Sequence, residues 1–137
     1  MSIFKRKKIN QVKRDWKIKK STLEFILESA KSSFPNEFGG FLRVDLDRKD
    51  TITELVILPG TISGNSHAIF KFYMLPIDFS IVGTVHSHPS FSSHPSEADI
   101  FLFRKFGKVH IIVAYPFTFS SWNSYNYNGE EIEIKVI

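Results

Sequence analysis

Residues 81–103 join a buried-strand pattern to a capped-helix pattern, which limits the chain to folds that combine strands with helices. The segment 81–88 is short, apolar and rich in β-branched residues until it reaches two histidines, as expected for a buried strand whose end lies at the surface. A loop over residues 89–95 follows. Ser96 is then placed to cap a second helix, and Gly107 is placed to end it.

The N-terminal third predicts a strand followed by a helix. Trp16 and Ile18 open a short first strand. Ser21 and Glu24 have the spacing of a capping box, and apolar residues then recur at helical spacing up to about Ser33. Because Pro35 follows directly, we expect the helix to end there.

The middle of the chain predicts a β-hairpin. Segments 38–47 and 51–58 have strand character, and Asp47 to Asp50 supplies turn residues between them. Further elements are expected as a loop over 59–67, a strand over 69–73 and a turn or short helix near Pro76 and Asp78.

The last third predicts strands only. Segment 109–115 has the pattern of a second buried strand, and 117–127 is an aromatic strand region. Residues 131–136 alternate as a half-buried strand, joined through Asn128-Gly129. Strands interleaved with two helices indicate an α/β fold on a mixed sheet.

The chain has no cysteine, which restricts its chemistry. A thiol nucleophile, a disulfide framework and every zinc site that needs thiolate are excluded, so any metal must rest on histidine and carboxylate. With 137 residues, 42% of them hydrophobic, we expect one soluble domain. No apolar stretch approaches the roughly 20 residues of a membrane span, so no membrane association and a cytoplasmic location are expected.

Positive charge gathers at the N-terminus. Residues 1–20 carry nine Lys/Arg against Asp15 alone, so this segment is +8 and the remainder of the chain is −4. Residues 1–15 are expected to be a basic, flexible extension, with the domain spanning 16–137. Such an arm could bind nucleic acid through salt-dependent contacts. Because no recognised nucleic-acid-binding motif accompanies it, a solvated tail is the favoured interpretation.

Two histidines and one aspartate form a candidate metal site. Side chains two apart in a strand point to the same face, so His86 and His88 can offer two imidazoles to one ion. Asp99, in the first turn of the next helix, is the natural third ligand, leaving a fourth position for water as catalytic zinc requires. A histidine pair in a strand is more often a surface or core feature, and Asp99 alone could simply favour the helix dipole. Their joint arrangement favours the metal site.

Residues 86–99 resemble the JAMM motif, His-x-His-Pro, six residues, then Ser-x-x-Asp, at His86, His88, Pro89, Ser96 and Asp99. The resemblance covers about residues 16–137. It implies an MPN (JAB) fold related to the cytidine deaminase architecture, with a mixed β-sheet flanked by helices. It also implies one zinc ion per chain.

A second carboxylate is needed to take a proton from the metal-activated water and pass it to a leaving amine. Glu37 is the candidate general base. It lies in the segment from Pro35 to Leu42, which looks like the upstream segment in which the family carries its catalytic glutamate. The resemblance also implies that Ser96 stabilises the oxyanion, whereas the residues themselves indicate only a capping role.

Three further histidines are left out of the predicted site. His94 lies inside the motif loop, but the set of three ligands is complete without it. His110, in an apolar strand, is interpreted as a hydrogen-bonded structural residue. His67 could line a substrate groove only if its loop folds over the site.

The site predicts a metal-dependent hydrolase, and the family resemblance implies the substrate. We expect a metalloprotease that cleaves an isopeptide or peptide bond after the C-terminal glycines of a ubiquitin-like modifier. Processing of a sulfur-carrier protein with a β-grasp fold is the first alternative. A non-catalytic MPN scaffold is the second, and a nucleic-acid-associated protein, suggested by the basic arm, is the third.

Overall fold

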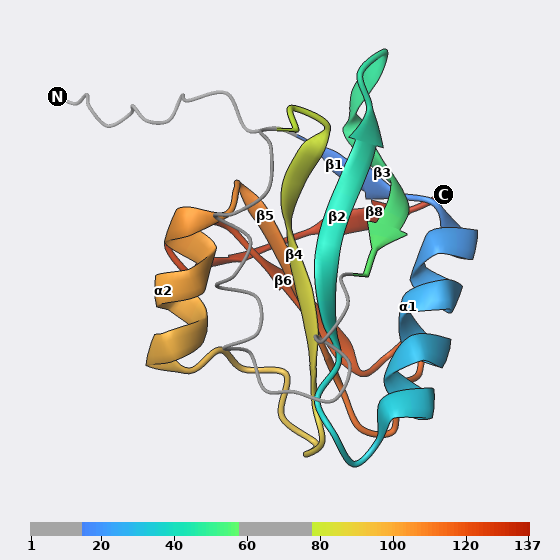
Figure 1. The fold of residues 1–137 in the computed structure, drawn as a ribbon, viewed down its shortest axis with the longest axis vertical. Coiled ribbons are helices and arrows are strands. Elements are labelled where there is room, and N and C mark those ends of the chain that lie inside the picture. Colours follow the sequence, from blue (N-terminus) through green and yellow to red (C-terminus); the bar gives the residue numbers. More distant parts are fainter. Residues whose placement is uncertain (1–14, 58–77) are drawn as a thin grey trace, which may run out of the picture.

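The computed structural model describes residues 15–57 and 78–137, which form a mixed eight-stranded sheet and two helices (Figure 1). The strand order is β7-β6-β5-β4-β2-β3-β1-β8. This confirms the predicted α/β fold on a mixed sheet. In chain order the elements are β1 (Trp16–Ile18), α1 (Lys20–Ser33), β2 (Gly39–Asp45), β3 (Arg48–Val56), β4 (Ile81–His88), α2 (Glu97–Lys105), β5 (Val109–Ala114), β6 (Trp122–Tyr125), β7 (Glu131–Ile132) and β8 (Ile134–Val136).

Some sequence predictions fall outside these residues. They are the basic extension up to residue 14, the loop over 59–67 with His67, the strand over 69–73 and the turn residue Pro76. Neither helix of the described segments is long and apolar enough to cross a membrane.

The two helices cover opposite faces of the sheet (Figure 1), and the side chains of β5 alternate between these faces. Val109, Ile111 and Val113 belong to the main core cluster, which includes the buried side of α1. The intervening residues His110 and Ile112 instead face α2, where they pack around Phe103. Successive strand residues point to opposite faces, so residue parity assigns each side chain to the α1 face or the α2 face.

Helix α1 has the predicted apolar stripe but a different start. Its predicted capping box at Ser21 and Glu24 is wrong, because the helix begins at Lys20 with no side-chain cap. Only Lys19 separates β1 from α1, and the acceptors come from β3 and from the residue that follows β8. The N–H of Lys19 donates to Ile52 O at 3.1 Å, and that of Lys20 donates to Ile137 O at 2.8 Å.

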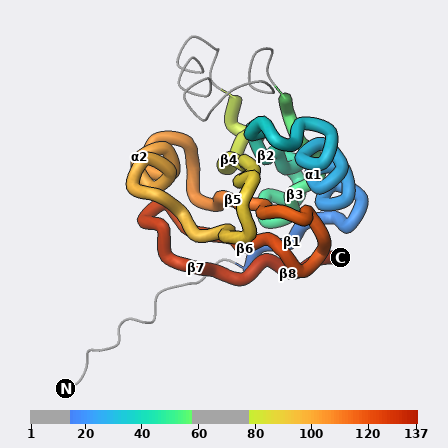
Figure 2. Tube along the Cα trace, turned by 90° about the horizontal axis from the view of Figure 1, so that it is seen from below, coloured from blue at the N-terminus to red at the C-terminus, as the bar shows by residue number. Residues whose placement is uncertain are grey.

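The C-terminal strand is broken where one continuous strand was predicted. Residues 131–132 pair with β6 as β7, whereas residues 134–136 pair in parallel with β1 as β8. These two strands lie at opposite edges of the sheet, and Glu133 alone joins them. The sheet therefore curls until its edges approach each other, which Figure 2 shows from below.

Other element bounds differ modestly from the predictions. The β2–β3 hairpin is present, but its turn is shorter because β3 already begins at Arg48. The aromatic region 117–127 contributes only the four residues of β6, since residues 115–121 turn back through Phe117 N–H to Ala114 O and Ser121 N–H to Thr118 O.

A glycine sets the closeness of the two central parallel strands. Gly83 of β4 pairs with Val109 of β5. A Cβ atom on Gly83 would overlap the carbonyl oxygen of Val109 and lie 2.6 Å from its carbonyl carbon. Only glycine permits this approach. The strand that carries both predicted histidine ligands is thus held tightly between β2 and β5.

Candidate metal centre

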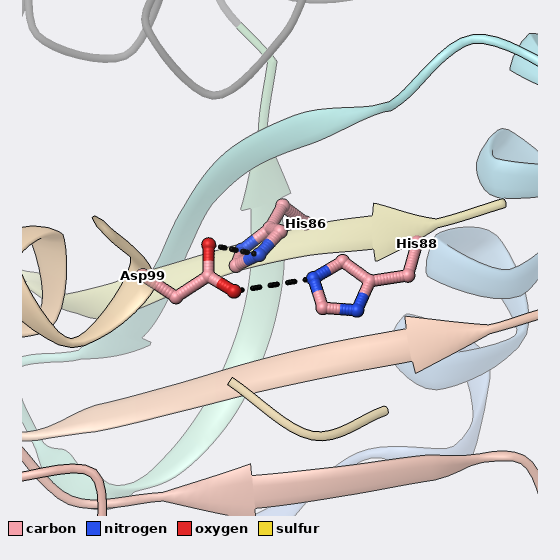
Figure 3. A group of neighbouring side chains, drawn as sticks. All are labelled: His86, His88 and Asp99. Atoms are coloured by element: carbon pink, nitrogen blue, oxygen red, sulfur yellow. Dashed lines mark hydrogen bonds and ion pairs between the residues drawn. The ribbon is translucent and has the colours of Figure 1, made fainter. Parts of the chain in front are cut away.

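The predicted ligands meet between β4 and α2. His86 and His88 end β4 on the face that α2 covers, and Asp99 belongs to the first turn of α2 (Figure 3). Figure 3 shows both rings directed at the carboxylate. One ligand atom from each of the three residues lies within 4.8 Å of the others.

The two carboxylate oxygens are divided between the two rings. Asp99 Oδ1 lies 3.0 Å from His86 Nε2, and Oδ2 lies 3.2 Å from His88 Nε2. Ligand atoms around a tetrahedral zinc with bonds of 2.0–2.2 Å lie about 3.4 Å apart. The two nitrogen–oxygen distances are close to this value.

His86 provides the clearest sign of a missing partner. Its side chain is 1% exposed. Although Nε2 is close to Asp99 Oδ1, the pair lacks hydrogen-bond geometry, so neither ring nitrogen has a hydrogen-bond partner among the described residues. A buried polar atom left without a partner is destabilising, and a metal ion would satisfy Nε2. The residues present therefore fit a zinc site.

His88 is held so that Nε2 is its ligand atom. Its Nδ1 lies 2.9 Å from the carbonyl oxygen of Ser92, an arrangement in which Nδ1–H donates and Nε2 keeps a lone pair. Burial alone would lower the pKa of His88. The hydrogen bonds to Asp99 and Ser92, with the charges of Asp99 and Glu37, outweigh burial and raise that pKa above its ordinary value.

Asp99 combines a ligand position with a structural one. It is 5% exposed and stands third in α2, where it forms the predicted capping box with Ser96. Ser96 N–H donates to Asp99 Oδ2 at 2.9 Å, and Asp99 N–H donates to Ser96 Oγ at 3.1 Å. Burial would raise the pKa of Asp99, but His86, His88 and the Ser96 N–H hold it well below its usual range. The carboxylate is ionised and fixed in place.

We expect Glu37 opposite His88. In the antiparallel pairing of β2 with β4, Gly39 faces His86, and the N–H of Ser87 donates to Phe38 O at 2.8 Å. Glu37 precedes β2, and this register, extended to Glu37, would put it opposite His88; the charge of Glu37 also contributes to raising the pKa of His88. Directly opposed residues in such a pair point to the same face, so we expect the half-buried Glu37 on the face that carries the metal cluster.

Two aromatic residues that the sequence did not single out hold the loop between the ligands. The hydroxyl of Tyr125 on β6 donates to Ser93 O at 2.6 Å. The backbone N–H of Tyr115 donates to Ser90 O at 2.9 Å. Both hydrogen bonds go to backbone carbonyls of the loop, so no side-chain motif in the loop sequence could predict them.

The two other histidines of the described residues are His110 and His94. His110 is fully buried, with Thr84 Oγ1 2.7 Å from Nδ1 and Gly107 O 3.0 Å from Nε2. This confirms its structural role. Burial lowers the pKa of His110 to about 4. His94 is exposed, and the metal cluster of the described residues does not include it.

Comparisons with known proteins agree with this geometry. A family model of prokaryotic homologs of the JAB domain matches residues 19–125. A probable metalloprotease from Haloferax volcanii is 36% identical over 122 residues, which cover 84% of this chain and 75% of the relative.

Solved structures add the fold and a zinc site. A JAB1/MPN domain protein from Archaeoglobus fulgidus is 41% identical with a TM-score of 0.72, covering 91% of this chain and 100% of that one. A structure described as a metalloprotease-like JAMM zinc site in the proteasome and signalosome is 42% identical with a TM-score of 0.71, covering 90% and 98%. A protein from Desulfitobacterium hafniense, 21% identical with a TM-score of 0.57, supports the fold alone. This chain is a prokaryotic member of the JAMM/MPN family.

Proposed function

We propose that the chain is a zinc-dependent isopeptidase that cleaves after the C-terminal glycines of a ubiquitin-like modifier protein, with Glu37 as general base. The observation that carries this proposal is the His86–His88–Asp99 cluster, and the electrostatic interaction of Glu37 with His88 supports the role of Glu37. Family membership supports zinc metallopeptidase chemistry. The modifier substrate is the finer part of the proposal.

His86, His88 and Asp99 would hold one zinc ion per chain. When bound, zinc supplies a Lewis acid that polarises the scissile carbonyl and lowers the pKa of water. Asp99 contributes the single negative charge of the ligand set, with Oδ1 3.0 Å from the Nε2 atom of the buried His86.

Glu37 moves the proton. Hydrolysis forms a C–O bond to water and breaks the C–N bond, and the amine leaves only if it gains a proton. The Glu37 carboxylate accepts the proton from water and delivers it to the departing lysine nitrogen. Its side chain is only half-buried, which supports this role.

Ser96 is proposed to stabilise the oxyanion. Its Oγ accepts the Asp99 N–H, but within the described residues its hydroxyl proton is not donated. Ser96 is exposed, so that proton can be offered to a substrate carbonyl oxygen.

The test is cleavage of two substrates by wild type and Glu37→Gln, followed by mass spectrometry. One substrate is a modifier joined to lysine by an isopeptide bond, and the other is a β-grasp sulfur carrier with a short C-terminal extension. We expect isopeptide cleavage, reduced by about 10²–10⁴-fold in Glu37→Gln at unchanged zinc content. Cleavage of the carrier alone would favour the sulfur-carrier alternative. Zinc-loaded protein that cleaves neither substrate would favour a scaffold.

A further inference from the structure

We propose that Ser87, the residue between the two histidine ligands, is a positioning residue that holds Glu37 in place for hydrolysis. This inference rests on the proposed function of Glu37. Ser87 is 1% exposed and, by its parity along β4, points to the α1 face, away from the metal cluster. Its side chain therefore has a role other than metal binding.

Ser87 holds the backbone of Phe38 at both of its polar groups. The N–H of Phe38 donates to Ser87 Oγ at 2.8 Å, and the N–H of Ser87 donates to Phe38 O at 2.8 Å. In a regular antiparallel pair the first of these bonds would go to a backbone carbonyl. Here the hydroxyl replaces that carbonyl, so one of the two hydrogen bonds of this pair depends on a side chain.

The same contact fixes the residue next to it. Glu37 directly precedes Phe38, and among the described residues its carboxylate has no hydrogen bond that could orient it. On its other side, the nearest backbone bond is from Asn36 N–H to Ser33 O at 2.8 Å. The position of Glu37 is consequently set by the backbone. The Ser87–Phe38 pair is the contact nearest to Glu37 among those that tie this backbone to the strand of His86 and His88.

Loss of the hydroxyl should release this segment without disturbing the ligands. Phe38 is 1% exposed, so in Ser87→Ala its N–H would be buried without an acceptor. Opening of residues 36–38 relieves that cost and displaces Glu37. Misplacement of a catalytic group by about 1 Å can reduce turnover about 100-fold.

The experiment compares wild type with Ser87→Ala, Ser87→Thr and Ser124→Ala. Threonine keeps the hydroxyl. Ser124 in β6 is the matched control, because it is also a buried serine, 3% exposed, and lies away from Glu37. Its Oγ donates to Ile132 O at 2.6 Å. Each protein is measured for amide hydrogen exchange by NMR, for zinc content and for steady-state cleavage.

For Ser87→Ala we expect Phe38 N–H exchange about 10- to 100-fold faster and kcat lower by about 10- to 100-fold, with KM and zinc content within about twofold of wild type. Ser87→Thr should recover both rates, and Ser124→Ala should change neither. An unchanged Phe38 exchange rate, or a loss of kcat no larger than that of Ser124→Ala, would overturn the positioning role. If wild type cleaves nothing, the proposed function fails by itself. The NMR signals of Glu37 then decide whether Ser87 positions it. Shifted Glu37 signals in Ser87→Ala would support the inference, and unchanged signals would overturn it.

Discussion

Replacing Gly83 by alanine should strongly destabilise the protein. The new Cβ would overlap Val109 O and lie 2.6 Å from the carbonyl carbon, whereas ordinary contacts begin near 3.4 Å. Strands β4 and β5 must therefore separate by about 1 Å or more. Two hydrogen bonds beside the clash would be weakened, those from Lys108 N–H to Val82 O at 2.8 Å and from Thr84 N–H to His110 Nδ1 at 3.2 Å.

The magnitude follows from these contacts. Overpacking costs about 1–3 kcal/mol, and two weakened hydrogen bonds add about 1 kcal/mol each, so we expect a loss of about 3–5 kcal/mol. For a domain of this size that lowers Tm by roughly 10–20 °C. Because β4 carries His86 and His88, zinc should also bind more weakly to Gly83→Ala.

Gly40→Ala is the matched control. Its Cβ would meet Val56 O at 2.7 Å and the movable tip of Leu55 at 2.9 Å, so we expect a smaller loss of about 1–2 kcal/mol. Urea unfolding followed by fluorescence of Trp16 and Trp122 measures both variants. If the free energy of unfolding of Gly83→Ala lies within about 1 kcal/mol of wild type, or falls less than that of Gly40→Ala, the close approach of β4 and β5 does not require glycine at position 83.

Two further predictions concern stability. The pKa of His110 is about 4 in the folded protein and near 6.5 when unfolded, so only the unfolded state binds its proton as pH falls from 6.5 towards 4, and about 3 kcal/mol of stability is lost across that window. In metal-free protein, His110→Gln should lack this part of the pH dependence, and equal slopes for the two proteins would contradict the prediction. Tyr125→Phe removes the hydrogen bond to Ser93 O and should cost about 1 kcal/mol in urea unfolding, whereas Tyr127→Phe, at an exposed position, should cost almost nothing. Equal losses in both tyrosine variants would refute the anchoring role of Tyr125.

The predictable features are those that local sequence determines. The run 81–88 was predicted as a buried strand because β-branched residues fill it, and the structure agrees. The capping box of Ser96 and Asp99 was also predictable, since its bonds join residues three apart. Two local features were then enough to predict that the three candidate ligands lie together. They are the side-chain alternation along β4 and the position of Asp99 in the first turn of α2.

What could not be predicted depends on residues distant in the sequence. Helix α1 starts at Lys20 because the carbonyl of Ile137, at the other end of the chain, accepts its N–H. Alternation over 131–136 is compatible with one strand, and only the closure of the sheet edges breaks it at Glu133. The bond from Phe38 N–H to Ser87 Oγ likewise joins positions 49 apart. No local pattern specifies such partners.

The most direct test of the account is the zinc content of protein purified without chelator or affinity-tag metal, measured for wild type, His88→Ala, Asp99→Ala and Glu37→Gln. We expect about one zinc per chain in wild type and in Glu37→Gln, and almost none in the two ligand variants. Wild type that binds no zinc even after zinc is added back, or ligand variants that retain it, would contradict the assignment of this site.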